Sequence, residues 1–133
     1  MSLLDQIVSE FDIIARELRD HVYPAESTDN DDQCLYVRET GESSLESACI
    51  IGYWLHRFHR VPLAAMHEHE GCNAGELIRT LLRMGHLPAV WWQQLGTREF
   101  AFLHTVQKQQ DNGAPWGEAV YRAKAADLSL QSA

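Results

Sequence analysis

The residues best suited to chemistry gather in the middle of the chain, where histidine and glutamate alternate before a cysteine. Six of the seven histidines lie between positions 21 and 86, and one short run contributes His67, His69 and Cys72. Zinc binds nitrogen and sulfur ligands of these types and needs about four of them converging on one point. The sequence contains neither the HExxH spacing of metalloproteases nor a CxxC pair. A zinc site at His67, His69 and Cys72 is therefore one alternative interpretation.

Acid–base catalysis would require a carboxylate or histidine in a pocket that shifts its pKa. The nearest candidates are Glu68, Glu70, Glu76 and His86, but their spacing singles out no pair. Glu76 also suits the capping of a helix that begins after Asn73. No glycine-rich phosphate loop is present in the sequence. We therefore expect a protein without catalytic activity and without a cofactor.

Residues 69–85, HEGCNAGELIRTLLRMG, combine a glycine-containing turn, a small polar cap and an E-L-I-R run. This segment resembles the turn and second helix of ribbon-helix-helix DNA-binding proteins, and the resemblance implies a DNA-binding regulator. The side chains that could contact phosphates are Arg57, Arg60, Arg79 and Arg83. That family has a basic strand and a longer first helix before the turn, whereas Pro62 lies only nine positions before Gly71. DNA binding is therefore kept as an alternative.

Negative charge is concentrated in the first third of the chain. The formal net charge is −8, with −9 over residues 1–46 and +1 over residues 47–133. An acidic surface repels nucleic acid phosphate and can bind a basic partner. We therefore expect a protein or a nucleoprotein complex as the partner, and nucleic acid alone is disfavoured.

The adjacent tryptophans Trp91 and Trp92 offer a second means of binding. Neighbouring residues on a helix cannot face the same way, so we expect one ring in the core and the other partly exposed. Tryptophan is enriched among the residues that dominate interface energies, and acidic residues nearby would supply a charged rim. We therefore assign partner binding to Trp91, Trp92, Asp29, Asp31 and Asp32.

Helices are predicted to position these residues. Apolar side chains at helical spacing and capping signals predict helices over 3–18, 62–71, 74–85, 88–96, 97–112 and from 115 onward. Ser2 with Asp5, and Asn73 with Glu76, have the spacing of capping boxes. These signals predict an all-α fold, a single compact bundle of about six or seven short helices in one domain, 1–133.

A further helix is predicted to begin at Ser43, because Ser43 and Glu46 also have capping-box spacing, and to end near His59. Gly52 lowers its helix propensity by up to about 1 kcal/mol and indicates the close approach of another helix. Just before it, residues 34–38 (CLYVR) have strand character and predict one short extended segment.

Two segments have little to bury. Residues 24–33, PAESTDNDDQ, predict a mobile acidic loop, and residues 127–133 are expected to fray. Over the whole chain the hydrophobic fraction is 45%, which is ordinary for a globular protein, and no apolar run approaches the roughly 18 residues of a membrane span. No membrane partner is therefore expected.

The three cysteines, Cys34, Cys49 and Cys72, are an odd number without close pairing, and the N-terminus lacks the pattern of a secretion signal. We therefore expect a cytoplasmic protein with free thiols.

The leading interpretation is a small acidic protein that binds a macromolecule. Such proteins without a catalytic motif are frequent among phage and mobile-element accessory proteins that inhibit host nucleic-acid-handling complexes, including anti-CRISPR proteins. This analogy rests on size and charge alone. The sequence predicts neither the oligomeric state nor the identity of the partner.

Overall fold

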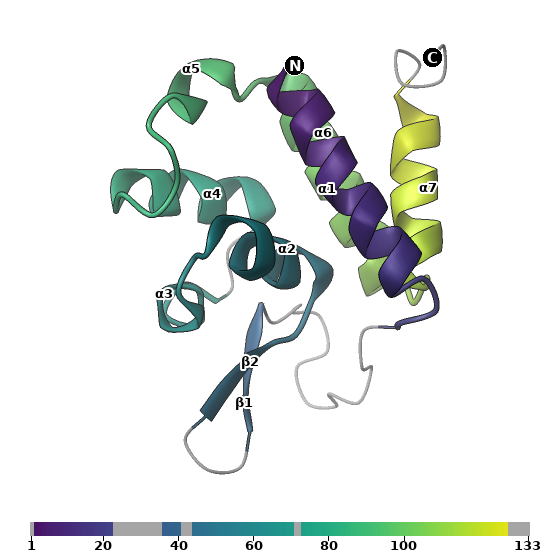
Figure 1. Ribbon diagram of the computed structural model, residues 1–133, viewed down its shortest axis with the longest axis horizontal. Helices are drawn as coiled ribbons and strands as arrows, with labels where there is room; N and C mark the ends of the chain where they lie inside the picture. Colours follow the sequence, from purple (N-terminus) through teal and green to yellow (C-terminus); the bar gives the residue numbers. More distant parts are fainter. Residues whose placement is uncertain (1, 23–35, 41–43, 71–72, 128–133) are drawn as a thin grey trace.

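Two groups of helices, with a small hairpin beside them, make up the fold in the computed structural model (Figure 1). The structure describes residues 2–22, 36–40, 44–70 and 73–127. In chain order the elements are α1 (Leu3–Glu17), β1 (Val37–Thr40), β2 (Ser44–Ser47), α2 (Ile50–His59), α3 (Leu63–His67), α4 (Ala74–Arg83), α5 (Trp91–Gln94), α6 (Thr97–Asp111) and α7 (Trp116–Ala126). The predicted all-α fold with one short extended segment is confirmed.

Helices α1, α6 and α7 pack against one another along their lengths (Figure 1). Each buries a stripe of apolar side chains at the spacing of a helix, which turns one face toward the common core. The buried residues of α1 are Leu3, Leu4, Ile7, Val8, Phe11 and Ile14. Those of α7, the helix predicted from 115 onward, are Trp116, Ala119, Val120 and Ala123.

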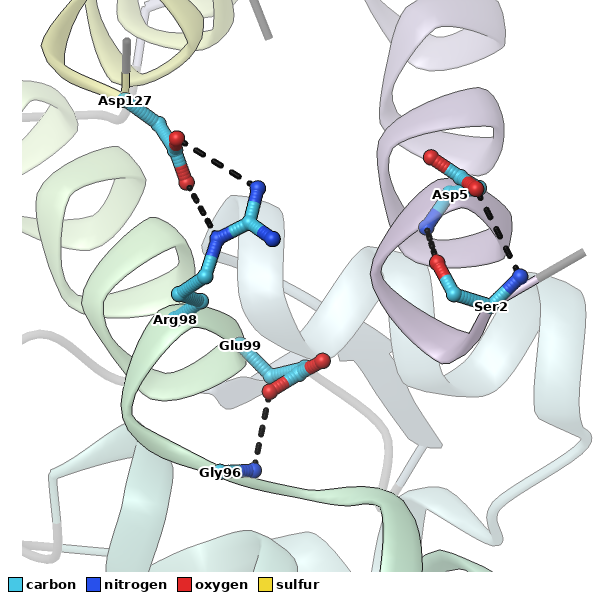
Figure 2. A network of polar contacts seen from close by, with 6 residues as sticks. All are labelled: Ser2, Asp5, Gly96, Arg98, Glu99 and Asp127. Atoms are coloured by element: carbon cyan, nitrogen blue, oxygen red, sulfur yellow. Dashed lines mark hydrogen bonds and ion pairs between the residues drawn. The ribbon is translucent and has the colours of Figure 1, made fainter. Parts of the chain in front are cut away.

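The ends of these helices are fixed by polar contacts (Figure 2). The predicted capping box of α1 is present, since the Asp5 N–H donates to Ser2 Oγ at 3.1 Å. Between α6 and α7, Arg98 Nε donates to Asp127 Oδ2 at 3.2 Å. Asp127 therefore belongs to an ordered ion pair, although the sequence predicts fraying from this residue. The remaining residues of that prediction, 128–133, and the predicted loop 24–33 lie outside the described residues.

The segment before α2 is a strand, so the helix predicted to begin at Ser43 begins instead at Ile50. Strands β1 and β2 pair antiparallel, with Arg38 opposite Glu46, and Arg38 Nε donates to the Glu46 carboxylate at 3.0 Å. Strand pairing satisfies the backbone and uses Glu46 across the hairpin, which overrides its local capping signal. The predicted extended segment is thus half of a hairpin.

Gly52 of α2 faces the backbone of Tyr36, which enters β1 and supplies the three described atoms nearest to position 52. A Cβ at position 52 would lie 2.3 Å from the Tyr36 carbonyl oxygen. The predicted close approach at Gly52 is therefore confirmed, but the neighbour is the backbone of Tyr36 and not a helix. Only glycine leaves room for this backbone contact.

Helix α6 supplies buried side chains that cap two other helices. Gln110 Oε1 accepts from the Ile50 N–H at 2.7 Å, and Gln107 Oε1 accepts from the Ala74 N–H at 3.3 Å. The N-cap residue of α2, Cys49, makes no capping hydrogen bond with its side chain. Unpaired N–H groups at a buried helix start are costly, so α6 holds α2 and α4 in place through these two glutamines.

Replacing Gln110 with leucine is expected to lower the free energy of unfolding by about 1–2 kcal/mol, because the buried Ile50 N–H loses its acceptor. Urea denaturation measures this loss. The matched control is Gln109→Leu, because Gln109 bonds Arg122 on the exposed surface. Equal losses in the two variants would contradict the capping role.

Candidate binding surface

The two adjacent tryptophans of α5 point in opposite directions, as the sequence predicts. Trp91 is 3% exposed, whereas Trp92 is 48% exposed. The assignment of partner binding to Trp91 is therefore corrected, because a buried ring cannot contact a partner directly. Trp92 is the member of the pair that remains available as an anchor.

Trp91 is held by two aromatic rings from α2. Its ring stacks on Trp54 with centroids 6.3 Å apart and meets the edge of His59 at 4.9 Å. Packing in the core fixes the orientation of a short helix that would not form alone. The packing of Trp91 therefore fixes the direction in which the Trp92 side chain projects from the surface.

Beneath this contact, Glu10 of α1 joins the same cluster. Its Oε1 atom accepts from Trp54 Nε1 at 2.8 Å and from His59 Nε2 at 2.9 Å. Burial by itself would raise the pKa of Glu10, but the hydrogen bonds from His59 and Trp54 and the nearby charge of His59 hold the pKa below its ordinary value. Glu10 therefore links α1 to α2 and holds in place the two rings, Trp54 and His59, against which Trp91 packs.

Three of the well-exposed apolar side chains lie close to one another in the sequence. Among the described residues, the large apolar side chains that are well exposed are Val22, Met84, Val90, Trp92 and Tyr121. Met84, Val90 and Trp92 fall within nine consecutive positions that link the end of α4 to α5. This corner lies at one edge of the molecule (Figure 1). Grouped apolar exposure of this kind is typical of interaction sites.

Two arginines lie on α4, the helix that leads into this corner. Arg79 lies over the Phe100 ring, 4.5 Å from its centroid, and Arg83 Nη2 donates to Thr80 Oγ1 at 3.2 Å. Neither arginine forms an ion pair within the described part of the chain. We call the surface formed by Arg79, Arg83, Met84, Val90 and Trp92 the α4–α5 edge.

The other two arginines of the DNA-binding alternative lie at the end of α2. Arg57 pairs with Glu17 of α1 and packs on Phe58, 4.9 Å from the ring centroid. Arg60 is the left-handed C-cap residue, with φ of 56°. The four arginines thus belong to two separate helices, and one of them is already neutralised by a carboxylate.

Residues 69–85 contain the expected helix, and the helix before it is short, as expected. Asn73 and Glu76 form the predicted capping box of α4. The preceding helix, α3, has only five residues. It is shorter than the first helix of that family, as the position of Pro62 indicates.

The His/Glu-rich run serves the hairpin. The Glu70 carboxylate accepts from the N–H groups of Tyr36 and Val37 at 2.9 and 3.1 Å. His67 Nε2 lies 3.4 Å from Glu39 of β1. Burial raises the pKa of Glu70 above its ordinary value, despite these backbone hydrogen bonds. Glu70 and His67 therefore anchor β1 to the end of α3.

The zinc alternative has no complete ligand set among the residues that the structure describes. No group of three or more His, Cys, Asp or Glu side chains there could hold a metal ion. Cys72 lies outside these residues, as do Asp29, Asp31 and Asp32 of the predicted binding set. The roles assigned to these four residues stay predictions.

Two open grooves flank α7, one of about 700 Å³ against α1 and one of about 370 Å³ against α6. The first contains Asp12, which pairs with Lys124, and the second contains the ion pair of Arg98 and Asp127. These charges hold helices together, so the grooves offer less for recognition than the α4–α5 edge.

Sequence reasoning missed Met84 and Val90 as surface residues. Their signal was present in the sequence, because they lie in a long stretch that contains no carboxylate. Apolar residues are found both in cores and on surfaces, so their exposure required the tertiary structure.

None of the helices in the described ranges is both long and apolar enough to cross a membrane. No protein-family model, curated protein or solved structure matches the chain. The candidate surface is therefore interpreted from its own geometry and charge.

Proposed function

We propose that the protein acts by binding another protein or a nucleoprotein complex through the α4–α5 edge, with Trp92 as the anchor. The observation that carries this proposal is the half-exposed Trp92, which directly follows a tryptophan locked in the core. Tryptophan anchors that insert into a partner's pocket contribute a large share of the energy of many interfaces.

The support beneath Trp92 favours this role. Trp91 is fixed by Trp54 and His59, and His59 is fixed by Glu10. A side chain presented by a rigid element loses less conformational entropy on binding than one on a free loop. Met84 and Val90, which precede α5 in the chain, are exposed apolar side chains that can add to the contact area.

Inhibition of a host nucleic-acid-handling complex is the more specific form of this proposal. It is supported by the small size of the chain and its net charge of −8. A bound inhibitor of this kind needs a stable interface and no catalytic group.

Replacing Trp92 with alanine is expected to weaken partner binding at least about tenfold, because the anchor of the interface is lost. Affinity capture from cells that make the protein, at low and at moderate salt, identifies the partner, and titration with the purified partner measures the loss. Thermal unfolding should change little, since Trp92 is exposed and does not belong to the buried core.

The matched control is Tyr121→Ala, which removes another exposed aromatic side chain, 71% exposed, from α7. A partner retained by wild type and Tyr121→Ala but lost by Trp92→Ala supports the proposal. Equal affinity of the two variants for the partner would place the interface elsewhere.

A further inference from the structure

The α4–α5 edge lies in a part of the chain that contains no acidic residue. Residues 77–98 include three arginines, whereas all 19 Asp and Glu residues lie outside this span. In a protein with a net charge of −8, this is a local reversal of sign. Positive and negative patches that complement a partner increase association rates and select among partners.

The carboxylates that border this span in the sequence cap helix starts and form no ion pair with Arg79 or Arg83. Glu76 Oε1 accepts from the Asn73 N–H at 3.0 Å. Glu99 Oε1 accepts from the Gly96 N–H at 2.8 Å (Figure 2). Both side chains fold back to cap the helices that begin beside them. They therefore neutralise no arginine of the edge.

Arg79 and Arg83 carry the remaining positive charge of the edge. Arg98 belongs to the same span but pairs with Asp127 (Figure 2). Arg79 and Arg83 are four positions apart on α4, so they share one helical face. Both are exposed. Arg83 directly precedes the exposed Met84, and Arg79 lies over the Phe100 ring, so each cationic group lies beside an apolar side chain.

We propose that the α4–α5 edge recognises an acidic protein surface that has an apolar pocket for Trp92. This proposal rests on the protein-binding function above and adds the chemistry of the partner. The two arginines pair with carboxylates at the rim, while Trp92, Met84 and Val90 bury apolar area at the centre. This arrangement fixes the orientation of the partner on the edge, because the positive charges lie on α4 and the anchoring tryptophan lies on α5.

A protein partner fits the edge better than a nucleic acid strand does. Met84 and Val90 are aliphatic and gain little against a phosphodiester backbone. Strong binding to nucleic acid rests on many phosphate contacts, whereas the edge offers two arginines.

The test uses the ¹⁵N-labelled full chain and three probes: a peptide in which leucine and phenylalanine alternate with glutamate, the same peptide with lysine in place of glutamate, and oligothymidine. The glutamate peptide is expected to shift the Trp92 indole signal and to bind at least about tenfold tighter than the lysine peptide at low salt.

Charge reversal at Arg83 gives the decisive comparison. Arg83→Glu is expected to weaken binding of the glutamate peptide about tenfold, because attraction at the rim becomes repulsion. The matched control is Lys108→Glu, since Lys108 is exposed and occupies the last turn of α6 as Arg83 does in α4. Both reversals therefore have the same effect on a helix dipole.

Three results would overturn the acidic-partner proposal: equal binding of the two peptides, tighter binding of oligothymidine, or no shift at the edge with any probe. Protein binding itself is judged separately. If Trp92→Ala loses both peptides while Arg83→Glu loses neither, the edge binds proteins without selecting acidic ones. If Trp92→Ala keeps the captured partner, the proposed function fails.

Discussion

Replacing Glu10 with alanine is expected to lower the free energy of unfolding by about 2–4 kcal/mol. The Glu10 carboxylate accepts hydrogen bonds from both Trp54 and His59, and only 15% of its side-chain surface is exposed. Without it, the indole N–H of a fully buried tryptophan and a ring nitrogen of His59 lose their acceptor in the core. Removing the acceptor leaves these buried donors unpaired, and an unpaired buried donor lowers stability by more than the hydrogen bond contributes to it.

Urea denaturation of wild type, Glu10→Ala and a control variant measures this effect. The control is Glu17→Ala, because Glu17 lies on the same helix and also pairs with α2, through Arg57, but at the exposed surface. Exposed ion pairs contribute little to stability, so a much smaller loss is expected there. A comparable loss in both variants would show that burial of the Glu10 network adds nothing.

The contribution of Glu10 to stability is also expected to depend on pH in the acid range. The pKa of Glu10 is below its ordinary value in the folded protein, so folding favours the ionised carboxylate. Its contribution is present above the unfolded-state pKa and is lost as the pH falls through the lowered, folded-state pKa. The stability difference between wild type and Glu10→Gln should therefore shrink in this acid range.

Comparing the two proteins at each pH isolates Glu10 from other groups. The pKa of Glu70 is raised in the folded state, so its contribution has the opposite sign and is lost as the pH rises. Glu70 titrates equally in wild type and Glu10→Gln, and its effect cancels in the difference. A difference that stays constant across the acid range would contradict the lowered pKa of Glu10.

Replacing Gly52 with alanine is expected to destabilise the protein by about 2–3 kcal/mol, against the usual preference of helices for alanine. The new methyl group would lie 2.3 Å from the Tyr36 carbonyl oxygen, a backbone atom that cannot rotate away. That carbonyl also accepts from the Ala48 N–H at 2.9 Å, so moving it disturbs the junction of hairpin and helix.

Gly75→Ala is the matched control for this substitution. Gly75 also lies in the first turn of a helix, but a Cβ there would meet side-chain atoms of His104 and Phe100 at 3.3 Å. Side chains can yield by small rotations, so a small effect is expected. Urea denaturation decides the matter, and stabilisation of Gly52→Ala by helix propensity would refute the close approach.

The sequence predicts well where a structure depends on neighbours in the chain. The capping boxes of Ser2 and Asn73 form as predicted, because each requires residues only three positions apart. The buried stripes of α1 and α7 follow from helical periodicity. The opposite directions of Trp91 and Trp92 follow from helix geometry alone.

The hairpin shows why other parts could not be predicted. Ser43 and Glu46 have the spacing of a helix start, but residues 44–47 pair with 37–40. Glu70 binds the entry to this hairpin from more than 30 positions away. A local capping signal does not produce a helix when pairing with distant residues satisfies the same backbone groups at lower free energy.

Some features of the candidate surface could likewise be predicted from the sequence, and others could not. The sequence by itself determined that one tryptophan of the pair faces outward and that residues 77–98 lack a carboxylate, because both facts follow from residue order. The tertiary structure decided that the exposed ring is Trp92, that Met84 and Val90 are also exposed, and that Glu76 and Glu99 cap helix starts. Exposure depends on which distant side chains cover a residue, and Trp54 and His59 of α2 cover Trp91.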